Sequence, residues 1–346
     1  MSARWILLFP AVLLCDLSLQ AMPPSCRPLN SFEQGSDLRQ SQMVPGYNAT
    51  ARVDVRGSWD VYTTASYIFW QPREENLAPG IYNGRDTTAY LAIDGKVINM
   101  NYHFKSGYKV GLGILTGYDN WDAYVEYTWL SGHQRVSATA PENGRIIPFQ
   151  GHVDAVQYSV FLSTKSKWKC ELNIVDVQLA RSYYVGTKLV FRPFFGGRAA
   201  WINQKYSTHY ILEILETPFS VRNSSHSWGL GPEVGFSANW LLGYGFRAIG
   251  SAEADILFTR YNLHSVETFA TNPMLLDVDL YQRHAFFLRP HSNLEFGFGW
   301  ETYFDNHNYH FDILGSYCFQ IFWDQNMFSS GDLYIHGVTG QLRLDF

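Results

Sequence analysis

The amino-acid sequence predicts an all-β protein: a transmembrane antiparallel up-and-down β-barrel of about 12–16 strands, with long extracellular loops and short periplasmic turns. Three observations predict this fold. The chain begins with an apolar segment of the length of an export signal. Segments of alternating polarity recur along it, many with bulky aromatic ends. The last segment of this kind stops on an aromatic residue.

The N-terminal segment has the parts of an export signal. Arg4 supplies a short positive region, Trp5–Leu14 is apolar, and Leu17–Ala21 offers a small residue before a cleavage point between Ala21 and Met22. A membrane-spanning helix needs roughly 20 apolar residues, so an anchor is the weaker alternative. We therefore predict a cleaved signal peptide at 1–21, an irregular polar segment at 22–56 and the barrel at 57–346.

The composition favours a membrane barrel over other classes. Charged residues make up 16% of the chain and aromatic residues another 16%, so a soluble protein would have too little polar surface to cover itself. The mean hydropathy of −0.16 is not that of a helical membrane protein. Residues that alternate between lipid and lumen explain both values. The net charge of −5 argues against a nucleic-acid partner, which calls for clustered Lys and Arg.

Alternating segments recur from Gly57 onward. The segment 121–129 places apolar and aromatic side chains on one face and Asp122, Glu126 and Thr128 on the other. We expect further strands at 97–104, 108–114, 244–256, 294–301 and 311–323, with a short turn at Ser106–Gly107. A single alternating segment also fits a half-buried soluble strand, but many together favour lipid contact. The connections 71–96, 132–151, 207–227 and 261–282 are the expected extracellular loops.

The final segment, Gly331–Phe346, is the most specific feature. Val338, Leu342, Leu344 and Phe346 share one face, where we expect them to face lipid and close the barrel. We expect 333–346 to pair antiparallel with the first strand, Trp59–Trp70, because an open edge would leave backbone groups unsatisfied in hydrocarbon. The alternative is a soluble edge strand that ends on Phe346.

Several stretches, in this order, resemble a known family. The chain resembles the pore-forming major outer-membrane proteins of Legionella and the MOMP-like proteins of chlamydia-related bacteria over 57–346. The resemblance implies a porin for small hydrophilic solutes without catalysis, in the bacterial outer membrane and crossing it many times. With three cysteines after the signal, the chain departs from the cysteine-rich chlamydial proteins, which argues against a heavily cross-linked envelope role. The stretches are Lys167–Tyr184, Leu189–Lys205, Trp228–Ala238, Trp240–Ala254, Leu294–Phe304, Gln320–Asn326 and Gly331–Phe346.

The polar strand faces supply candidate pore-lining residues. We predict passive diffusion of small hydrophilic solutes and ions, with a weak cation preference because carboxylates dominate the set. The alternatives are a non-conducting adhesin or envelope-structural protein on the same barrel, and a barrel enzyme. The candidates are Asp122, Glu126, Arg247, Glu253, Asp255, Glu295, Glu301, Arg343 and Asp345.

The sequence predicts no catalytic, cofactor or metal site. It has no GxSxG elbow, and the pair His307 and His310 near Asp305 is more typical of polar surface than of a metal site. Cys170 and Cys318 fit small apolar strand positions, although with Cys26 the odd number leaves one thiol free or paired between molecules. The expected partners are outer-membrane lipid, the barrel-assembly machinery through the C-terminal strand, solutes and, as an open alternative, a second copy of the chain.

Overall fold

The computed structural model describes residues 49–56, 60–83, 95–117, 119–141, 144–151, 161–212, 218–269 and 278–346. All of them belong to the compact unit Asn48–Phe346. The predicted signal peptide and most of the segment 22–56 lie outside the described residues, so both remain predictions. Within these ranges, no helix is long and apolar enough to cross a membrane.

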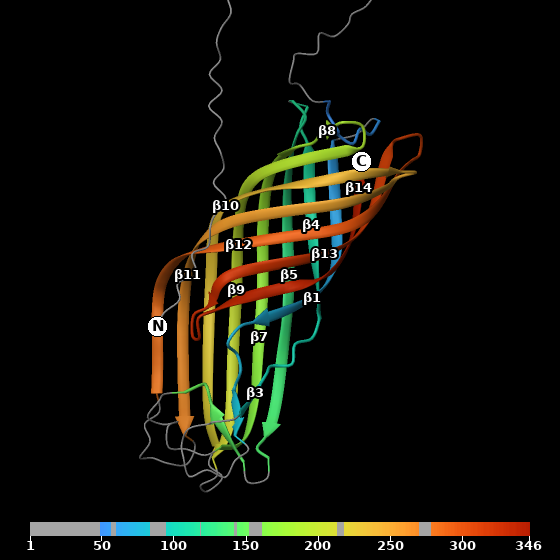
Figure 1. Cartoon of the computed structure of the whole chain (residues 1–346). Coiled ribbons are helices and arrows are strands. Elements are labelled where there is room, and N and C mark those ends of the chain that lie inside the picture. The colour runs from blue at the N-terminus through green and yellow to red at the C-terminus, as the bar shows by residue number, and fades with distance from the viewer. Residues whose placement is uncertain are drawn as a thin grey trace, which may run out of the picture. The chain divides into compact units, whose positions relative to one another are not determined.

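The described residues form one antiparallel sheet of fourteen strands, and ten of these close into a barrel (Figure 1). Around the ring the order is β1, β14, β13, β12, β11, β10, β9, β7, β5 and β4, and β4 pairs with β1 again. The ring strands are β1 (Val61–Glu74), β4 (Lys105–Leu115), β5 (Trp121–Thr139), β7 (Phe161–Arg181), β9 (Leu189–Leu212), β10 (Pro218–Gly243), β11 (Phe246–Phe269), β12 (Val278–Phe304), β13 (Tyr309–Asn326) and β14 (Gly331–Asp345).

The other four strands do not belong to the wall. β2 (Gly80–Asn83), β3 (Gly95–Ile98) and β6 (Arg145–Pro148) form a branch attached to β7, and β8 (Tyr183–Val185) pairs with β9. The predicted closed β-barrel is therefore confirmed. The fourteen described strands fall within the predicted range, but the wall itself has only ten.

The ends of the wall differ in the length of their connections. Tight turns near Asn120, Gly245 and Asn306 join strands at the end that is uppermost in Figure 1, which we name the turn end. Gly245 adopts a φ of +83°, a left-handed conformation that suits glycine in such a turn. The connections from β1 to β4 and from β5 to β7 lie at the opposite end of the wall, which we name the loop end. In outer-membrane barrels the short turns are periplasmic and the long loops extracellular.

The barrel closes through its first and last strands, as predicted. β1 and β14 pair antiparallel from Tyr62 opposite Asp345 to Glu74 opposite Leu333. The described part of β1 begins at Val61, so the predicted start at Trp59 lies outside the described residues. Val338 and Leu342 are exposed on the outer face, and Leu344 and Phe346 are half-buried.

Two predictions near the start of the barrel are wrong. The segment 97–104 is not a wall strand, because β3 ends at Ile98 and belongs to the branch. The predicted turn at Ser106–Gly107 lies inside β4, where both residues pair with β1. A Cβ atom at Gly107 would lie 2.3 Å from the carbonyl oxygen of Trp129. The glycine therefore permits a close strand approach rather than a turn.

The wall strands are also longer than predicted. Most of the expected loop 207–227 consists of β9 and β10, which pair up to Ile211 opposite Pro218, and the expected loops 132–151 and 261–282 begin or end in strand. β12 has 27 residues. A membrane-spanning strand needs only about 9–11, so the wall continues well past the bilayer. Polar residues in this projecting part look like loops in the sequence.

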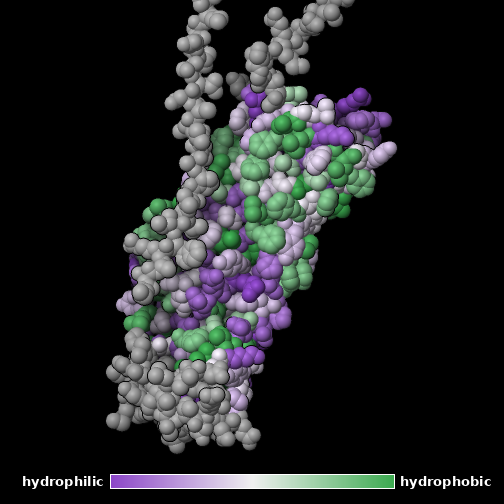
Figure 2. All heavy atoms as spheres, viewed as in Figure 1, coloured by the Kyte–Doolittle hydropathy of each residue, from purple (hydrophilic) through white to green (hydrophobic). Residues whose placement is uncertain are grey.

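The outer face carries an apolar belt that ends before the loop end. On β10 the belt extends from Trp228 to Trp240, and on β11 from Phe246 to Phe258. Beyond it, β10 exposes Arg222. Figure 2 shows apolar side chains gathered toward the turn end and hydrophilic ones between them and the loop end. The belt marks the part of the wall that contacts lipid.

Candidate functional site in the barrel interior

The interior consists of two layers that follow one another along the strands. β7 shows the change most clearly. Its inward residue Asp176 is succeeded toward the loop end by inward Ile174, Leu172 and Cys170, all buried. We name the part from Asp176 to the turn end the charged layer, and the part from Ile174 toward the loop end the apolar layer.

Arg198 on β9 lies at the centre of the charged layer. Its guanidinium donates to Asp176 at 2.6 Å, to Asp255 at 2.7 Å and to Glu253 at 3.1 Å. It also donates to Glu233 at 3.2 Å. These partners come from β7, β10 and β11, so one side chain ties four strands together. A single buried cation thus bonds to four carboxyl groups.

His291 extends this cluster to β12. Its Nδ1 lies 2.7 Å from Asp255 Oδ2 and 2.7 Å from an Arg198 nitrogen. The imidazole is almost completely buried against Phe322, with ring centroids 4.1 Å apart. His291 therefore lies where the charged layer meets the apolar layer.

Two further ion pairs brace the wall near β4, β5 and β9. Arg192 donates to both carboxylate oxygens of Asp122, at 2.6 and 3.0 Å. Lys109 donates to Glu126 at 2.9 Å, and the hydroxyl of Tyr124 donates to the other oxygen of Glu126, also at 2.9 Å. Two-pronged pairing of this kind is among the stronger charge-assisted interactions.

A third group joins the closing strand to its neighbours. Arg343 donates to Asp345 at 2.6 Å, and the other oxygen of Asp345 lies 2.9 Å from His310 Nδ1. Arg247 donates to Glu301 at 3.0 Å and also to Asp312. These pairs connect β11, β12, β13 and β14 at the turn end.

All nine sequence-predicted pore-lining residues lie in the charged layer, and each has a polar partner. Eight are in the ion pairs described above, with Arg192, Lys109, Arg198 or one another. The ninth, Glu295, accepts a hydrogen bond from Ser316. Whether they line a conducting path stays a prediction. The charged residues that the sequence analysis missed are Lys109, Asp176, Arg192, Arg198, Glu233, His291, His310 and Asp312.

Some of the missed residues had a usable signal. Lys109 and Asp312 lie on the polar face of alternating segments that the sequence identified correctly. Arg198 had none, because the stretch around it is apolar on both faces. Its neighbours Phe194 and Ala200 face inward, while Phe195 and Trp201 face outward.

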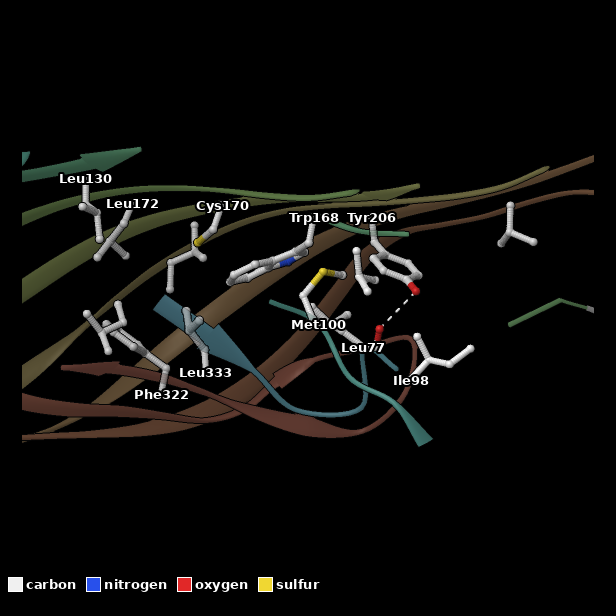
Figure 3. Packing of buried hydrophobic residues seen from close by; sticks show 14 of the residues in the cluster. Leu77, Ile98, Met100, Leu130, Trp168, Cys170, Leu172, Tyr206, Phe322 and Leu333 are labelled. Atoms are coloured by element: carbon white, nitrogen blue, oxygen red, sulfur yellow. Dashed lines mark hydrogen bonds between the residues drawn. The ribbon is translucent and has the colours of Figure 1, made fainter. Parts of the chain in front are cut away.

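The apolar layer fills the interior between the charged layer and the loop end. Figure 3 shows residues from opposite walls facing one another, with Leu77 and Met100 packed between them. Both belong to the connection from β1 to β4, and Tyr206 holds it by donating to the Leu77 carbonyl at 3.1 Å. The layer consists of Ile68, Trp70, Leu130, Trp168, Cys170, Leu172, Ile174, Ala200, Ile202, Phe322, Leu333 and Ile335 on the wall, with Leu77, Ile98 and Met100 inserted.

One space in the interior lies within the charged layer. A cavity of about 220 Å³ is lined there by Lys109, Glu126, Glu253 and Glu295, among others. At about 30 Å³ for each water molecule, it holds roughly seven. The wall and inserted side chains of the apolar layer are each less than a tenth exposed. Within the part of the chain that the structure describes, the layer is therefore closely packed between this cavity and the loop end.

The interior contains no assembled redox or metal chemistry among the described residues. Cys170 and Cys318 are buried free thiols in the apolar cluster, whereas Cys26 lies outside the described residues. In the described ranges, no three His, Cys, Asp or Glu side chains gather in a way that could hold a metal ion. The interpretation of the pair His307 and His310 as polar surface is wrong for His310, which is buried and bonds to Asp345, whereas His307 lies in the turn that follows β12.

Comparison with known proteins identifies one family. A family model described as the Legionella pneumophila major outer membrane protein precursor matches residues 54–339. A search of curated proteins finds no significant match.

Solved structures resemble the chain only distantly. The outer membrane protease OmpT from Escherichia coli is 8% identical, with 86% of this chain and 99% of that chain covered and a TM-score of 0.41. A major outer membrane protein from Thermus thermophilus is 11% identical, with 81% and 99% covered and a TM-score of 0.30. A Pseudomonas aeruginosa FadL homologue is 8% identical, with 83% and 89% covered and a TM-score of 0.24. At these values the likeness says nothing about function.

Proposed function

Because the chain belongs to the family of the Legionella pneumophila major outer membrane protein and forms a barrel of the outer membrane, we propose that it is a non-conducting envelope-structural protein that presents loops at the cell surface. This was the alternative to the porin in the sequence analysis. The observation that carries the proposal is the apolar layer. The layer is closely packed and mostly apolar, with few polar side chains such as Gln204 and Gln320 at its height, so a hydrated ion that entered it would lose much of its water, and such desolvation is costly.

The charged layer supports the same role. Its carboxylates and cations bond to one another across the interior rather than facing a wide aqueous path, as the Arg198 cluster illustrates. Paired charges of this kind stiffen the wall from inside. The proposal includes no catalysis, since the sequence lacks a nucleophile motif and the interior charges are occupied with one another.

A pore for small hydrophilic solutes is the second candidate, favoured by one observation. The residues that complete the apolar layer, Leu77, Ile98 and Met100, belong to a connection and not to the wall. Withdrawal of that connection would widen the interior. Carboxylates outnumber Lys and Arg in the charged layer, so such an open state would prefer cations.

Planar-bilayer conductance distinguishes the two candidates. The refolded full-length barrel is expected to give no discrete current steps at neutral pH. The variant Ile98→Asp/Met100→Asp places two carboxylates where both side chains are now buried. It is expected to expel the inserted connection and to produce discrete, cation-preferring steps.

The matched control uses exposed positions of the same segment. Val97 and Asn99 alternate with Ile98 and Met100 and are solvent-exposed, so Val97→Asp/Asn99→Asp adds the same charge without disturbing the layer. Like the parent protein, this control is expected to give no discrete current steps. Regular open-channel steps from the unmodified barrel would instead establish the pore and remove the proposal.

A further inference from the structure

Beyond the apolar belt, one side of the barrel carries an exposed cationic surface. Register places Lys169 beside His133 on β5 and beside Lys205 on β9. One step toward the loop end, Lys167 lies beside Arg135 and beside Ser207, whose other neighbour is Arg222 on β10. We name this surface the cationic face; its members are Arg135, Lys165, Lys167, Lys169, Lys205 and Arg222, all exposed.

The cationic face begins just above the aromatic edge of the belt. On β9, Lys205 follows Trp201 by four residues, and on β10, Arg222 precedes Trp228 by six. At about 3.3 Å per residue and a tilt of roughly 40°, these cations lie about 10–15 Å above the aromatic ring level. Aromatic side chains mark the interface between hydrocarbon and headgroups. The backbone of these residues lies above the headgroup level, but long Lys and Arg side chains can extend back toward it and reach the phosphates of outer-leaflet headgroups.

The charge of this face is one-sided and mostly uncompensated. Lys169 pairs with Glu171 on the same strand. In the described part of the chain, no carboxylate forms an ion pair with Lys165, Lys167 or Lys205, and none with Arg222. Asp279, at the margin of the face, pairs with His264 at 2.7 Å. Across the barrel, the corresponding outer surface presents acidic residues instead: Glu75, Asp324 and Asp332.

The face is also hollowed. A groove of about 480 Å³ lies over β7, β9, β10 and β11. Lys167, Lys169, Lys205 and Arg222 contribute cations to its lining, and Ser207 and Ser224 contribute hydroxyl groups. Such a lining suits an anion with several oxygen acceptors, because ammonium and guanidinium groups donate strongly to phosphate.

We propose that the cationic face binds the phosphorylated headgroup of an outer-leaflet lipid, with the acyl chains of that lipid lying on the belt below Trp201 and Trp228. Because the groove adjoins the apolar belt, a lipid fits this surface better than a soluble phosphate. The groove stands directly above the belt, so one molecule reaches both surfaces at once. Several clustered cations next to a membrane surface are the usual basis for recognising anionic lipids.

The test measures lipid binding by the full-length barrel in a neutral detergent, using native mass spectrometry. The probes are a bisphosphorylated disaccharide lipid, the same lipid after enzymatic dephosphorylation, and inorganic pyrophosphate. The variant is Lys167→Gln/Lys205→Gln/Arg222→Gln. The matched control, Arg56→Gln/Lys96→Gln/Lys188→Gln, removes three exposed cations that lie away from the groove. Heat-modifiable mobility in gels verifies that each barrel is folded.

We expect the phosphorylated lipid to bind the parent protein and the control equally, and the variant on the order of 100-fold more weakly. The dephosphorylated lipid should bind at least tenfold more weakly than the phosphorylated one. Equal binding of the two lipids, or equal binding by parent and variant, overturns the proposal. If pyrophosphate binds as tightly as the lipid, the groove is a site for soluble phosphate and the lipid assignment is wrong. The result is independent of conductance, so it stands or falls separately from the proposed function.

Discussion

Replacing Arg198 by Met tests whether the charged layer holds the barrel together. The guanidinium is 5% exposed and bonds to Asp176, Asp255, Glu253 and Glu233. Met keeps most of the apolar stem of Arg198 but leaves these four carboxylates without their guanidinium partner. Breaking a buried ion pair by removing one partner costs about 3–5 kcal/mol, because the remaining charge is left uncompensated. We expect the free energy of unfolding to fall by that amount at pH 7.

The assay is urea unfolding of the refolded barrel in detergent, followed by tryptophan fluorescence. With an m-value of about 2.5 kcal/mol/M, the midpoint should fall by roughly 1–2 M. At acid pH the difference between the urea midpoints of the parent protein and Arg198→Met should become smaller, because protonation of the unpaired carboxylates removes their mutual repulsion. Arg181→Met is the control, since Arg181 pairs with Asp119 at 2.9 Å on the exposed turn end, where an ion pair contributes about 0–1 kcal/mol. If Arg198→Met behaves like this control, or if acid does not narrow the gap, the central role of Arg198 is refuted.

Five further predictions concern the belt, the charged layer, the closing strand, Glu74 at the loop end, and export. Leu112→Arg should destabilise the barrel by about 2–4 kcal/mol if it lies near the midplane, because Leu112 is exposed beside Val125 in the belt; a urea midpoint equal to the parent's would contradict this. Alternation alone predicts that Asp122→Arg or Glu126→Arg is tolerated, but their pairing with Arg192 and Lys109 now predicts a clear loss in the same titration. Deleting residues 337–346 should abolish assembly, measured by heat-modifiable mobility, because β1 and β13 would both lose their partner; a folded deletion variant would show that closure does not need this strand. Burial raises the pKa of Glu74, which lies at the loop end beyond the belt and accepts a hydrogen bond from Gln204 at 2.9 Å. The folded state therefore holds this proton more tightly than the unfolded chain, and stability falls as pH rises above the ordinary glutamate pKa of 4.5. Glu74→Gln should thus stabilise the barrel at pH 8 and change little at pH 4, and a uniform effect at both pH values would argue against a raised pKa. Intact-mass measurement should find a mature chain that starts within a few residues of Met22, and retention of residues 1–21 would refute the signal peptide.

The sequence by itself determined the class of fold and the way the barrel closes. Alternation with a period of two is a local property of each strand, and so is the aromatic character of the belt. The closing strand could be recognised because Val338 and Leu342 alternate with Arg343 and its polar neighbours up to the last residue. Its pairing with β1 follows from the need to satisfy every backbone group in lipid.

Only the tertiary structure decided which face of each strand is polar at each height. β7 carries Asp176 inward and Val177 outward within the belt, but Leu172 inward and Lys169 outward beyond it. The polarity of the two faces inverts because the outer environment changes from lipid to water while the interior changes from charged to apolar. An inversion of this kind looks like a lost pattern in the sequence, which is why the sequence predicts loops where the strands project. Arg198 was missed for a related reason, since its four partners come from three other strands, and only the register and curvature of the wall bring them together.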